Sequence, residues 1–371
     1  MSMLQHSPRA WGSPSRYIQG RYELENMKTH TEVYGRRVFF LIDVFFFADY
    51  KKRFEALYAG SDSQIQCEQF GGQCTEEEIL RCTGLAKALN PDVVVGIGGG
   101  KTMDTAKAVA ENLGLPCVII PTVASNDAPC SGVAVLYNDA GVVIKAVLMR
   151  RNPDLVLVDT GIIANAPRRL FAAGLGDALS TWFEARACKN SGARTMARGN
   201  VSNTGLMMAR LCYDLLMEKG RDALAAVERH EVTPALEDVV EATIYLSGLG
   251  FENGGLAAAH AVNDGFAQEP QAHGMYHGEK VAFGTLVQLV LEKAPQEELE
   301  QVLAFLRDTG LPLTLAQLGV KEIVPETLKK VAEAAVVPTQ STKNLRADIT
   351  AQEVYDAILE ADRIGRDYLA R

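Results

Sequence analysis

The sequence has no cysteine framework. Seven cysteines occur among 371 residues, which is an odd number, and none stands in a Cys-x-x-Cys pair. This pattern argues against a disulfide scaffold. It predicts reduced thiols and a cytoplasmic protein.

Long apolar runs and long basic runs are also lacking. No segment reaches the roughly 20 apolar residues of a membrane span, and the most apolar stretch, residues 38–48, contains Asp43. The N-terminus has no basic start followed by an apolar segment, so we expect no secretory signal. The formal net charge is −9, which argues against a protein that follows nucleic-acid phosphates. We therefore expect neither a membrane nor a nucleic-acid partner.

The first part of the chain alternates apolar strands with helical segments. Short apolar runs predict buried strands, and polar starts followed by periodic apolar residues predict helices. The expected strands are 38–42, 92–96, 116–121 and 155–159, and the expected helices are 75–89 and 102–113. Apolar, non-alternating strands between helices are typical of a parallel sheet covered on both faces.

From Pro167 onward only helical patterns remain. The predicted helices cover 170–189, 204–219, 236–249, 279–291, 297–309, 325–335 and 351–369. At about 100–200 residues per domain, we predict an α/β domain over residues 1–165 and an all-α domain over residues 166–371. Residues 1–12 show no periodicity and are expected to extend from the fold.

A glycine-rich turn, residues 96–102, lies between a predicted strand and a predicted helix. Glycines let backbone N–H groups approach an anion, and the following helix N-terminus favours negative charge. Lys101 replaces the last glycine of the Gly-x-Gly-x-x-Gly fingerprint, and Val95 replaces the first glycine of the P-loop. The turn predicts phosphate binding, with a tight strand-to-helix turn as the alternative.

Polar residues follow other strands of the predicted sheet. Asp43 follows the first strand and could accept hydrogen bonds from ribose hydroxyls or cap a helix. Thr122 and Ser125 follow the strand that ends at Pro121, at the sheet edge where ligands bind. Asp127 lies in the next loop, where an acid is often only a loop residue.

Only six histidines occur, and three of them lie at 260, 273 and 277. His260 and His277 are 17 residues apart, so they cannot share one helix face, but two segments could bring them together. With Asp177 they would form the three-ligand open site of a catalytic zinc. Alternatively, Asp177 caps a helix and each histidine is structural.

Five stretches in order resemble a known family. They are GIGGGKTMDTAKA (96–108), PTVASNDAPCS (121–131), AAGLGDALSTWFEARA (172–187), GGLAAAHAV (254–262) and YHGEKVAFGTL (276–286). The sequence from residue 13 onward is similar to the glycerol dehydrogenases of the metal-dependent group III (iron-type) alcohol dehydrogenase family. That resemblance implies a dehydroquinate synthase-like fold: a Rossmann-like dinucleotide-binding domain, a helical metal-binding domain and an active site in the cleft between them.

The resemblance also implies roles for single residues. The metal ligands, and with Asp127 the catalytic residues, would be Asp177, His260 and His277. Asp127 would bind the polyol substrate. NAD would be bound by Asp43, Gly98, Gly99, Gly100, Lys101, Thr102, Asp104, Thr122, Ser125, Ser131, Val133 and Tyr137.

The implied activity is the reversible, NAD-dependent oxidation of glycerol and related vicinal diols to dihydroxyacetone or its analogues. Zinc, with iron as the alternative, would polarise the alcohol oxygen, and the enzyme would be a homo-oligomer. Asn126, Asn263 and Gly274 depart from the family pattern at positions where threonine or histidine is expected.

The sequence leaves two alternative functions open: an enzyme of the same family with another substrate, and a protein without catalytic activity. A glycerol-1-phosphate dehydrogenase or a dehydroquinate-synthase-like lyase would need several basic side chains in the cleft, where we expect Lys280 and little else. A non-catalytic nucleotide-binding protein would not need to retain the Asp177, His260 and His277 set.

Overall fold

The computed structural model describes residues 8–138, 141 and 143–371. It contains two compact units: one is formed by residues 12–166 and 226–245, and the other by the described part of 1–11 with 167–225 and 246–371. The expected N-terminal extension falls partly outside the described residues, but Arg9 forms a β-bridge with Asn200 in the second unit. The division into domains 1–165 and 166–371 stays a prediction.

The first unit is built on a parallel six-stranded sheet. The strand order is β1 (Tyr17–Gly20), β8 (Leu155–Asp159), β5 (Cys117–Pro121), β4 (Val93–Gly98), β2 (Arg37–Ile42) and β3 (Gln64–Gln69). Every neighbouring pair is parallel. The four predicted strands are confirmed, and they occupy the middle of the sheet.

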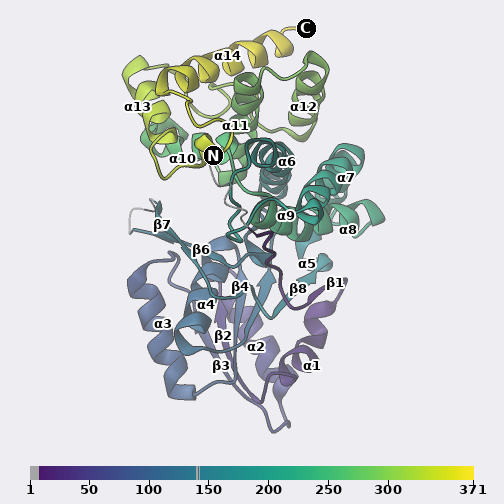
Figure 1. The fold of residues 1–371 in the computed structure, drawn as a ribbon. Coiled ribbons are helices and arrows are strands. Elements are labelled where there is room, and N and C mark those ends of the chain that lie inside the picture. Colours follow the sequence, from purple (N-terminus) through teal and green to yellow (C-terminus); the bar gives the residue numbers. More distant parts are fainter. Residues whose placement is uncertain (1–7, 139–140, 142) are drawn as a thin grey trace. The chain divides into compact units, whose positions relative to one another are not determined.

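Helices cover both faces of this sheet (Figure 1). On one face, α1 (Met27–Glu32) and α2 (Phe47–Tyr58) share a buried apolar cluster with alternate residues of the strands, and Phe54 stacks on Phe40 at 4.7 Å. On the other face lie α3 (Glu76–Leu89) and α4 (Gly100–Leu113). A Cβ added at Gly96 would lie 2.4 Å from the Ala106 side chain, so α4 packs directly against β4. Doubly covered strands explain the continuous apolar runs in the sequence.

The first unit also contains elements that periodicity did not predict. An antiparallel hairpin joins β6 (Val133–Tyr137) and β7 (Val143–Leu148). The short helix α5 (Thr160–Ala164) was not predicted either, whereas α8 (Pro234–Val240) and the π-helical turn Glu241–Leu246, whose last residue belongs to the second unit, overlap the predicted helix 236–249.

The second unit is helical, and the described residues beyond 166 include no strand. Its helices are α6 (Arg168–Ser191), α7 (Asn203–Glu228, which ends in the first unit), α9 (Ser247–Gly254), α10 (Ala258–Gly265), α11 (His277–Glu292), α12 (Gln296–Thr309), α13 (Pro325–Ala335) and α14 (Ala351–Leu369). The predicted helices are confirmed, except that 236–249 is divided between α8, the π-helical turn and α9. Gly176 of α6 and Gly278 of α11 let these two helices approach closely, because an added Cβ at either position would meet the backbone of the other helix at 2.5 Å or less.

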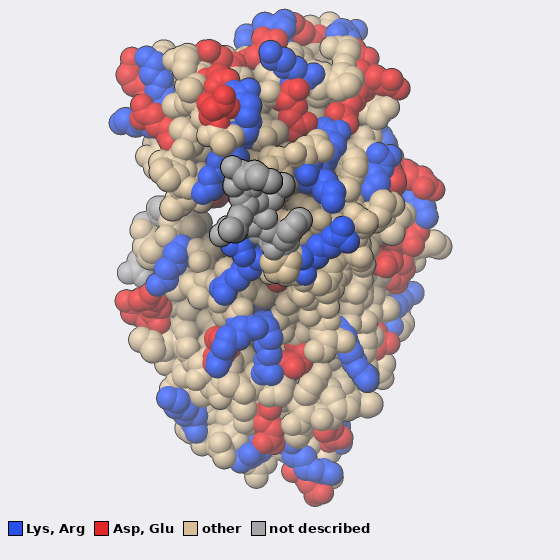
Figure 2. Space-filling model, viewed as in Figure 1, with Lys and Arg blue, Asp and Glu red and all other residues tan. Residues whose placement is uncertain are grey.

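The surface carries charges of both signs. Over α13 and α14, acidic and basic side chains intermix (Figure 2), and Arg363 of α14 pairs with Glu360 and Asp367. Within the described residues, no helix is both long enough and apolar enough to cross a membrane. The seven cysteines, all in the described residues, form no disulfide.

Candidate functional site

Three side chains from three helices converge in the helical unit. Asp177 lies on α6, His260 on α10, and His277 is the first residue of α11. One ligand atom from each lies within 4.8 Å of the other two. The Nε2 atoms of His260 and His277 lie 3.5 and 3.2 Å from Asp177 Oδ1. The structure therefore brings together the three residues that the sequence singled out as metal ligands.

Asp177 is not a helix cap. The helix begins at Arg168 after Pro167, so Asp177 stands in the interior of α6, and its side chain is fully buried. The N-cap alternative is therefore wrong. Burial would raise the pKa of this carboxyl, but His277 and His260 outweigh burial and hold the pKa well below its usual range. Asp177 is therefore an anion at neutral pH, as a metal ligand must be.

A second buried carboxylate orients His260. Glu184 Oε2 lies 2.6 Å from His260 Nδ1, and Glu184 Oε1 accepts hydrogen bonds from the backbone N–H groups of Ala257 and His260. Burial alone would lower the pKa of His260, but the carboxylates of Glu184 and Asp177 raise it well above its ordinary value. The imidazole is thus fixed with Nδ1 toward Glu184 and Nε2 toward Asp177.

His277 is placed by the start of α11. Glu279 accepts a hydrogen bond from the backbone N–H of Tyr276, the N-cap residue, and it forms an ion pair with Arg169 of α6 at 2.6 Å. The His277 side chain is 44% exposed, whereas that of Asp177 is fully buried. The cluster is thus closed on the Asp177 side and open on the His277 side.

The donor set fits a divalent cation. One carboxylate oxygen and two imidazole nitrogens suit zinc or iron and leave a coordination position for a further ligand. Glu184 supports this assignment, because metal-ligating histidines usually donate their other ring N–H to a carboxylate or carbonyl. Two buried carboxylates beside two imidazoles also favour a cation, since buried charge needs compensation.

In the first unit, the glycine-rich turn joins β4 to α4. Gly99 precedes the helix without a side-chain cap, which leaves the first N–H groups of α4 for another acceptor. Asp43 accepts a hydrogen bond from the Thr102 hydroxyl at 3.0 Å, and a Cβ at Gly98 would lie 2.8 Å from the Asp43 Cβ. The structure thus places Asp43 beside the turn, although Asp43 also accepts a hydrogen bond from the N–H of Phe45.

A buried ammonium group ties the loop after β5 and the start of β6 to α4. Lys107 donates to the carbonyls of Ala128 and Val133 and pairs with Asp104 at 3.1 Å. Asp104 in turn accepts a hydrogen bond from the N–H of Val135. The two oxygens of Asp104 therefore bind Lys107 and the N–H of Val135, and through these contacts Asp104 helps to hold the loop and β6 against α4.

The other predicted nucleotide residues lie in the same unit, and two of them, Thr122 and Tyr137, contact the turn. The backbone N–H of Thr122 donates to the Gly98 carbonyl, and the Lys101 ammonium lies 4.7 Å from the centre of the Tyr137 ring. Ser131 lies 3.5 Å from the Lys107 ammonium. The remaining predicted residue of this group is Ser125, which lies next to Asn126.

Asp127 and the three departures from the family pattern lie in both units. In the first unit, Asp127 is buried at the start of a short 3-10 turn, and Asn126 caps the N–H of Ala128 and lies against Gly100. In the second unit, Asn263 is buried one turn after His260, and Gly274 accepts a hydrogen bond from Arg169.

Sequence reasoning missed three supporting residues: Glu184, Lys107 and Gln288. Glu184 follows Asp177 by seven residues on α6, and Lys107 follows Asp104 by three on α4. Both spacings put the pair on one helix face, so this signal was available. Nothing in the sequence points to Gln288, which accepts hydrogen bonds from the N–H groups of Ala258 and Ala259 at the start of α10.

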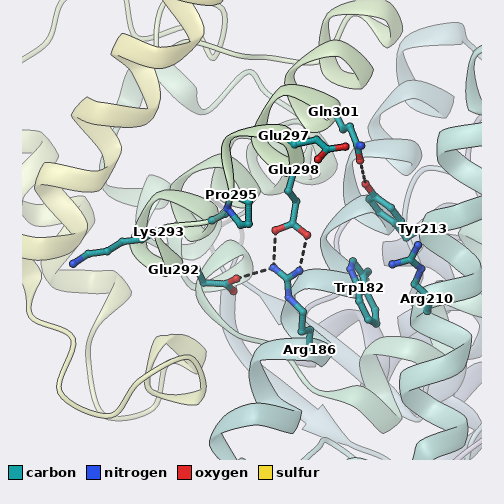
Figure 3. Close-up of a pocket in the computed structure, with 11 residues that line it drawn as sticks. Trp182, Arg186, Arg210, Tyr213, Glu292, Lys293, Pro295, Glu297, Glu298 and Gln301 are labelled. Atoms are coloured by element: carbon teal, nitrogen blue, oxygen red, sulfur yellow. Dashed lines mark hydrogen bonds and ion pairs between the residues drawn. The ribbon is translucent and has the colours of Figure 1, made fainter.

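A separate pocket of about 420 Å³ opens between α6, α7 and α12. Figure 3 shows Arg186 at its centre, held by Glu298 and Glu292, with Trp182 and Arg210 beside it. Two carboxylates already engage the Arg186 guanidinium, so Arg186 is not available to an anionic ligand. None of the candidate site residues lines it.

Comparisons with known proteins found similar sequences and similar solved structures. Residues 14–160 match the family model of iron-containing alcohol dehydrogenases. A glycerol dehydrogenase from Escherichia coli O6:H1 is 49% identical over 96% of this chain and 97% of its own length. A glycolaldehyde reductase from Halobacterium salinarum is 40% identical over 95% of this chain and 97% of its own length. A probable glycerol dehydrogenase from Sinorhizobium meliloti, known from a crystal structure, has 43% sequence identity to this chain. The two structures superpose with a TM-score of 0.92, and the match covers 97% of this chain and all of that one.

Proposed function

Because the chain belongs to the iron-containing alcohol dehydrogenase family, we propose that it oxidises glycerol and related vicinal diols with NAD⁺, reversibly. The observation that carries this proposal is the convergence of Asp177, His260 and His277 on one point. Relatives named glycerol dehydrogenase that span nearly the whole chain support the choice of substrate.

Asp177, His260 and His277 would hold the metal ion, zinc or iron. When bound, such an ion supplies Lewis acidity toward an alcohol oxygen, and NAD⁺ supplies the hydride acceptor. The chain contributes the rest: Asp177 provides the negative charge, Glu184 holds the His260 ring in place, and the more exposed His277 leaves one side of the cluster open.

The nucleotide would lie along the glycine-rich turn. The uncapped N-terminus of α4 and the glycines 98–100 suit a pyrophosphate, and Lys101 adds a positive charge beside it. Asp43 would accept hydrogen bonds from the ribose hydroxyls. The same carboxylate would repel a 2′-phosphate, which favours NAD over NADP. The remaining nucleotide contacts would come from Thr102, Thr122, Ser125, Ser131, Val133 and Tyr137, and Asp104 would support them by holding Lys107 and the N–H of Val135.

Asp127 would accept a hydrogen bond from a neighbouring hydroxyl of the substrate and so favour diols over simple alcohols.

We further propose a cytoplasmic homo-oligomer with a dinucleotide-binding domain at 1–165 and a metal-binding domain at 166–371. The glycolaldehyde reductase relative favours a second candidate, the reduction of a small hydroxyaldehyde, which uses the same set of residues in the opposite direction.

A spectrophotometric assay at about 340 nm tests the proposal. Glycerol, 1,2-propanediol and glycerol phosphate are each offered with NAD⁺ or NADP⁺, and glycolaldehyde is offered with NADH. Each assay is run before and after chelation, with zinc or iron restored. The proposal predicts NADH formation from the free diols that is lost on chelation and regained with metal. Turnover restricted to glycerol phosphate, or turnover unaffected by chelation, would overturn it.

A further inference from the structure

Glu184 lies beside the candidate metal site and is not one of the expected ligands. Its side chain is fully buried on α6, and its two oxygens have different partners. Oε1 accepts from the backbone N–H groups of Ala257 and His260 at 2.8 and 3.0 Å. Oε2 faces His260 Nδ1 at 2.6 Å.

This arrangement determines which nitrogen of His260 carries the proton. A carboxylate only accepts hydrogen bonds, so the Nδ1 that faces Glu184 must be the protonated nitrogen. In the neutral ring, Nε2 is then left with its lone pair, and Nε2 points toward Asp177 at 3.5 Å. Only a nitrogen with a free lone pair can bind a metal ion.

We propose that Glu184 is a positioning residue that holds His260 in its Nδ1-protonated tautomer and thereby sets the affinity of the site for its metal ion. The proposal rests on the metal site of the proposed function. Glu184 acts through His260 and does not itself need to touch metal, cofactor or substrate. Its two backbone bonds make the arrangement rigid, because they fix the carboxylate independently of the imidazole.

Glu184→Gln separates this role from a structural one. The amide oxygen of the variant must face the two backbone N–H groups, because an NH₂ group there would oppose two donors. The NH₂ group is then directed at His260 Nδ1, which can only accept from it. The ring proton is thereby moved to Nε2, the nitrogen that faces the metal. An isosteric change that keeps both backbone bonds therefore selects the wrong tautomer.

Glu184→Ala should have the larger effect on structure and the smaller effect on the His260 tautomer. It removes the acceptor of both backbone N–H groups, which is the larger structural loss, but it leaves the imidazole free to take either tautomer. If Glu184 only supported the helix, the alanine variant would bind metal more weakly than the glutamine variant. The tautomer proposal predicts the reverse order.

Gln288→Leu is the matched control. Gln288 is buried and accepts hydrogen bonds from the next two N–H groups of the same helix start, Ala258 and Ala259, at 2.9 and 3.0 Å. No hydrogen bond connects Gln288 to the His260 ring among the described residues. Its loss should lower the melting temperature while leaving metal affinity within about threefold of wild type.

The test uses the full-length chain, stripped with a chelator and titrated with Zn²⁺ and Co²⁺. Kd comes from competition with a chromophoric chelator, and the visible absorption of Co²⁺ reports its coordination. We expect Glu184→Gln to weaken binding by about 10- to 100-fold, more than Glu184→Ala, and to change the Co²⁺ spectrum. Wild-type affinity and spectrum in Glu184→Gln, or weaker binding in Glu184→Ala than in Glu184→Gln, would overturn the proposal.

The same titration distinguishes failure of the metal site itself. If wild type and Asp177→Asn bind Zn²⁺ and Co²⁺ equally, the metal site of the proposed function is wrong, and the role of Glu184 fails with it. If wild type binds tightly, Asp177→Asn does not, and Glu184→Gln matches wild type, only the role of Glu184 is wrong.

Discussion

At the scale of single residues, the candidate metal site depends on a glycine as well as on its ligands. Gly278 lies next to His277, and an added Cβ there would lie 1.8 Å from the carbonyl oxygen of Ala173 and 3.2 Å from the Asp177 Cβ. The missing side chain lets α11 approach α6 closely enough for His277 and Asp177 to meet.

Gly278→Ala should therefore destabilise the helical unit and weaken the metal site. Overpacking of this kind costs about 1–3 kcal/mol or more, and urea unfolding of the metal-free protein measures it. Gly274→Ala is the control: a Cβ at Gly274 has no neighbour within 4 Å, so its free energy of unfolding should stay within about 0.5 kcal/mol of wild type. Equal losses in the two variants would show that the close approach is not what matters.

The sequence predicted the three candidate metal ligands but not Glu184, which supports one of them. Asp177, His260 and His277 were found because they lie in stretches that resemble a family, whereas spacing alone left a cap and structural histidines open. Glu184 was missed because a buried glutamate in a helix carries no local signal, and only its spacing of seven residues from Asp177 placed it on the same face. Its function depends on contacts with α10, 73 and 76 residues further along the chain.

At the scale of elements, the buried pair of Asp104 and Lys107 holds the loop after β5 on α4. Both side chains are nearly fully buried. Burial raises the pKa of Asp104, against the opposing effect of Lys107. Breaking such a pair leaves one charge without compensation, which costs more than removing both charges.

Lys107→Met should therefore destabilise the protein by about 3–5 kcal/mol and raise the KM for NAD, since the loop it holds carries predicted nucleotide residues. The double variant Asp104→Asn, Lys107→Met should recover part of that stability, because the asparagine oxygen can still accept from the N–H of Val135. Urea unfolding and a KM measurement check both effects. Additive losses in the double variant would contradict the account.

The starts of β2 and β4 are joined through Asp92. Its carboxylate accepts hydrogen bonds from the N–H groups of Arg36 and Arg37 and from the Arg37 side chain. The Arg37 hydrogen bond is the main cause that lowers the pKa of Asp92 to about 2. Because the pKa of Asp92 is lower in the folded state, its carboxylate stabilises the fold at pH values above about 3.9, the ordinary pKa of an aspartate. This stabilisation is lost as the pH falls toward about 2.

Asp92→Asn should lower the free energy of unfolding at neutral pH by about 1 kcal/mol and flatten its decline as the pH falls below about 4. Urea unfolding at a series of pH values measures both. Asp62→Asn is the control, because the Asp62 side chain is 91% exposed and its ion pair with Arg36 is long, at 3.6 Å. A pH dependence in Asp92→Asn as steep as in wild type would show that Asp92 does not contribute.

The interior strands could be predicted from the sequence, and the edge strands could not. β2, β4, β5 and β8 are continuous apolar runs because both faces of each strand are covered. β1 and β3 lie at the edges of the sheet, are only partly buried and contain Gln19, Gln64 and Gln66, so hydrophobic pattern did not reveal them. The hairpin of β6 and β7 was missed as well, and the β7 side chains are mostly exposed.

At the scale of the whole molecule, the two proposed binding sites belong to different units. The metal ligands all lie in the unit of residues 167–225 and 246–371, and the predicted nucleotide residues all lie in the unit of residues 12–166 and 226–245. The chain passes between the units more than once, since 226–245 joins the first unit and Arg9 pairs with Asn200 in the second. No local sequence signal predicts such a return.

Hydrogen exchange should therefore respond separately to the two ligands. Binding to the native state raises local protection where the ligand orders its surroundings. Zn²⁺ should slow exchange in α6, the start of α10 and the start of α11, and NAD⁺ should slow it in residues 96–104 and the start of β6. Mass spectrometry of peptides from the full chain measures this. Protection of residues 96–104 by Zn²⁺ alone, or none around His260, would contradict the assignment.

The central claim, that the metal site is needed for turnover, is tested most directly by measuring turnover as a function of the number of metal ions bound per chain. The full chain is stripped of metal, Zn²⁺ or Fe²⁺ is added back stepwise, and NADH formation from glycerol is followed in wild type and in Asp177→Asn. Wild-type turnover should start near zero and rise until about one ion per chain is bound, and Asp177→Asn should stay inactive throughout. Undiminished turnover in the stripped protein, or turnover in Asp177→Asn that rises as in wild type, would contradict it.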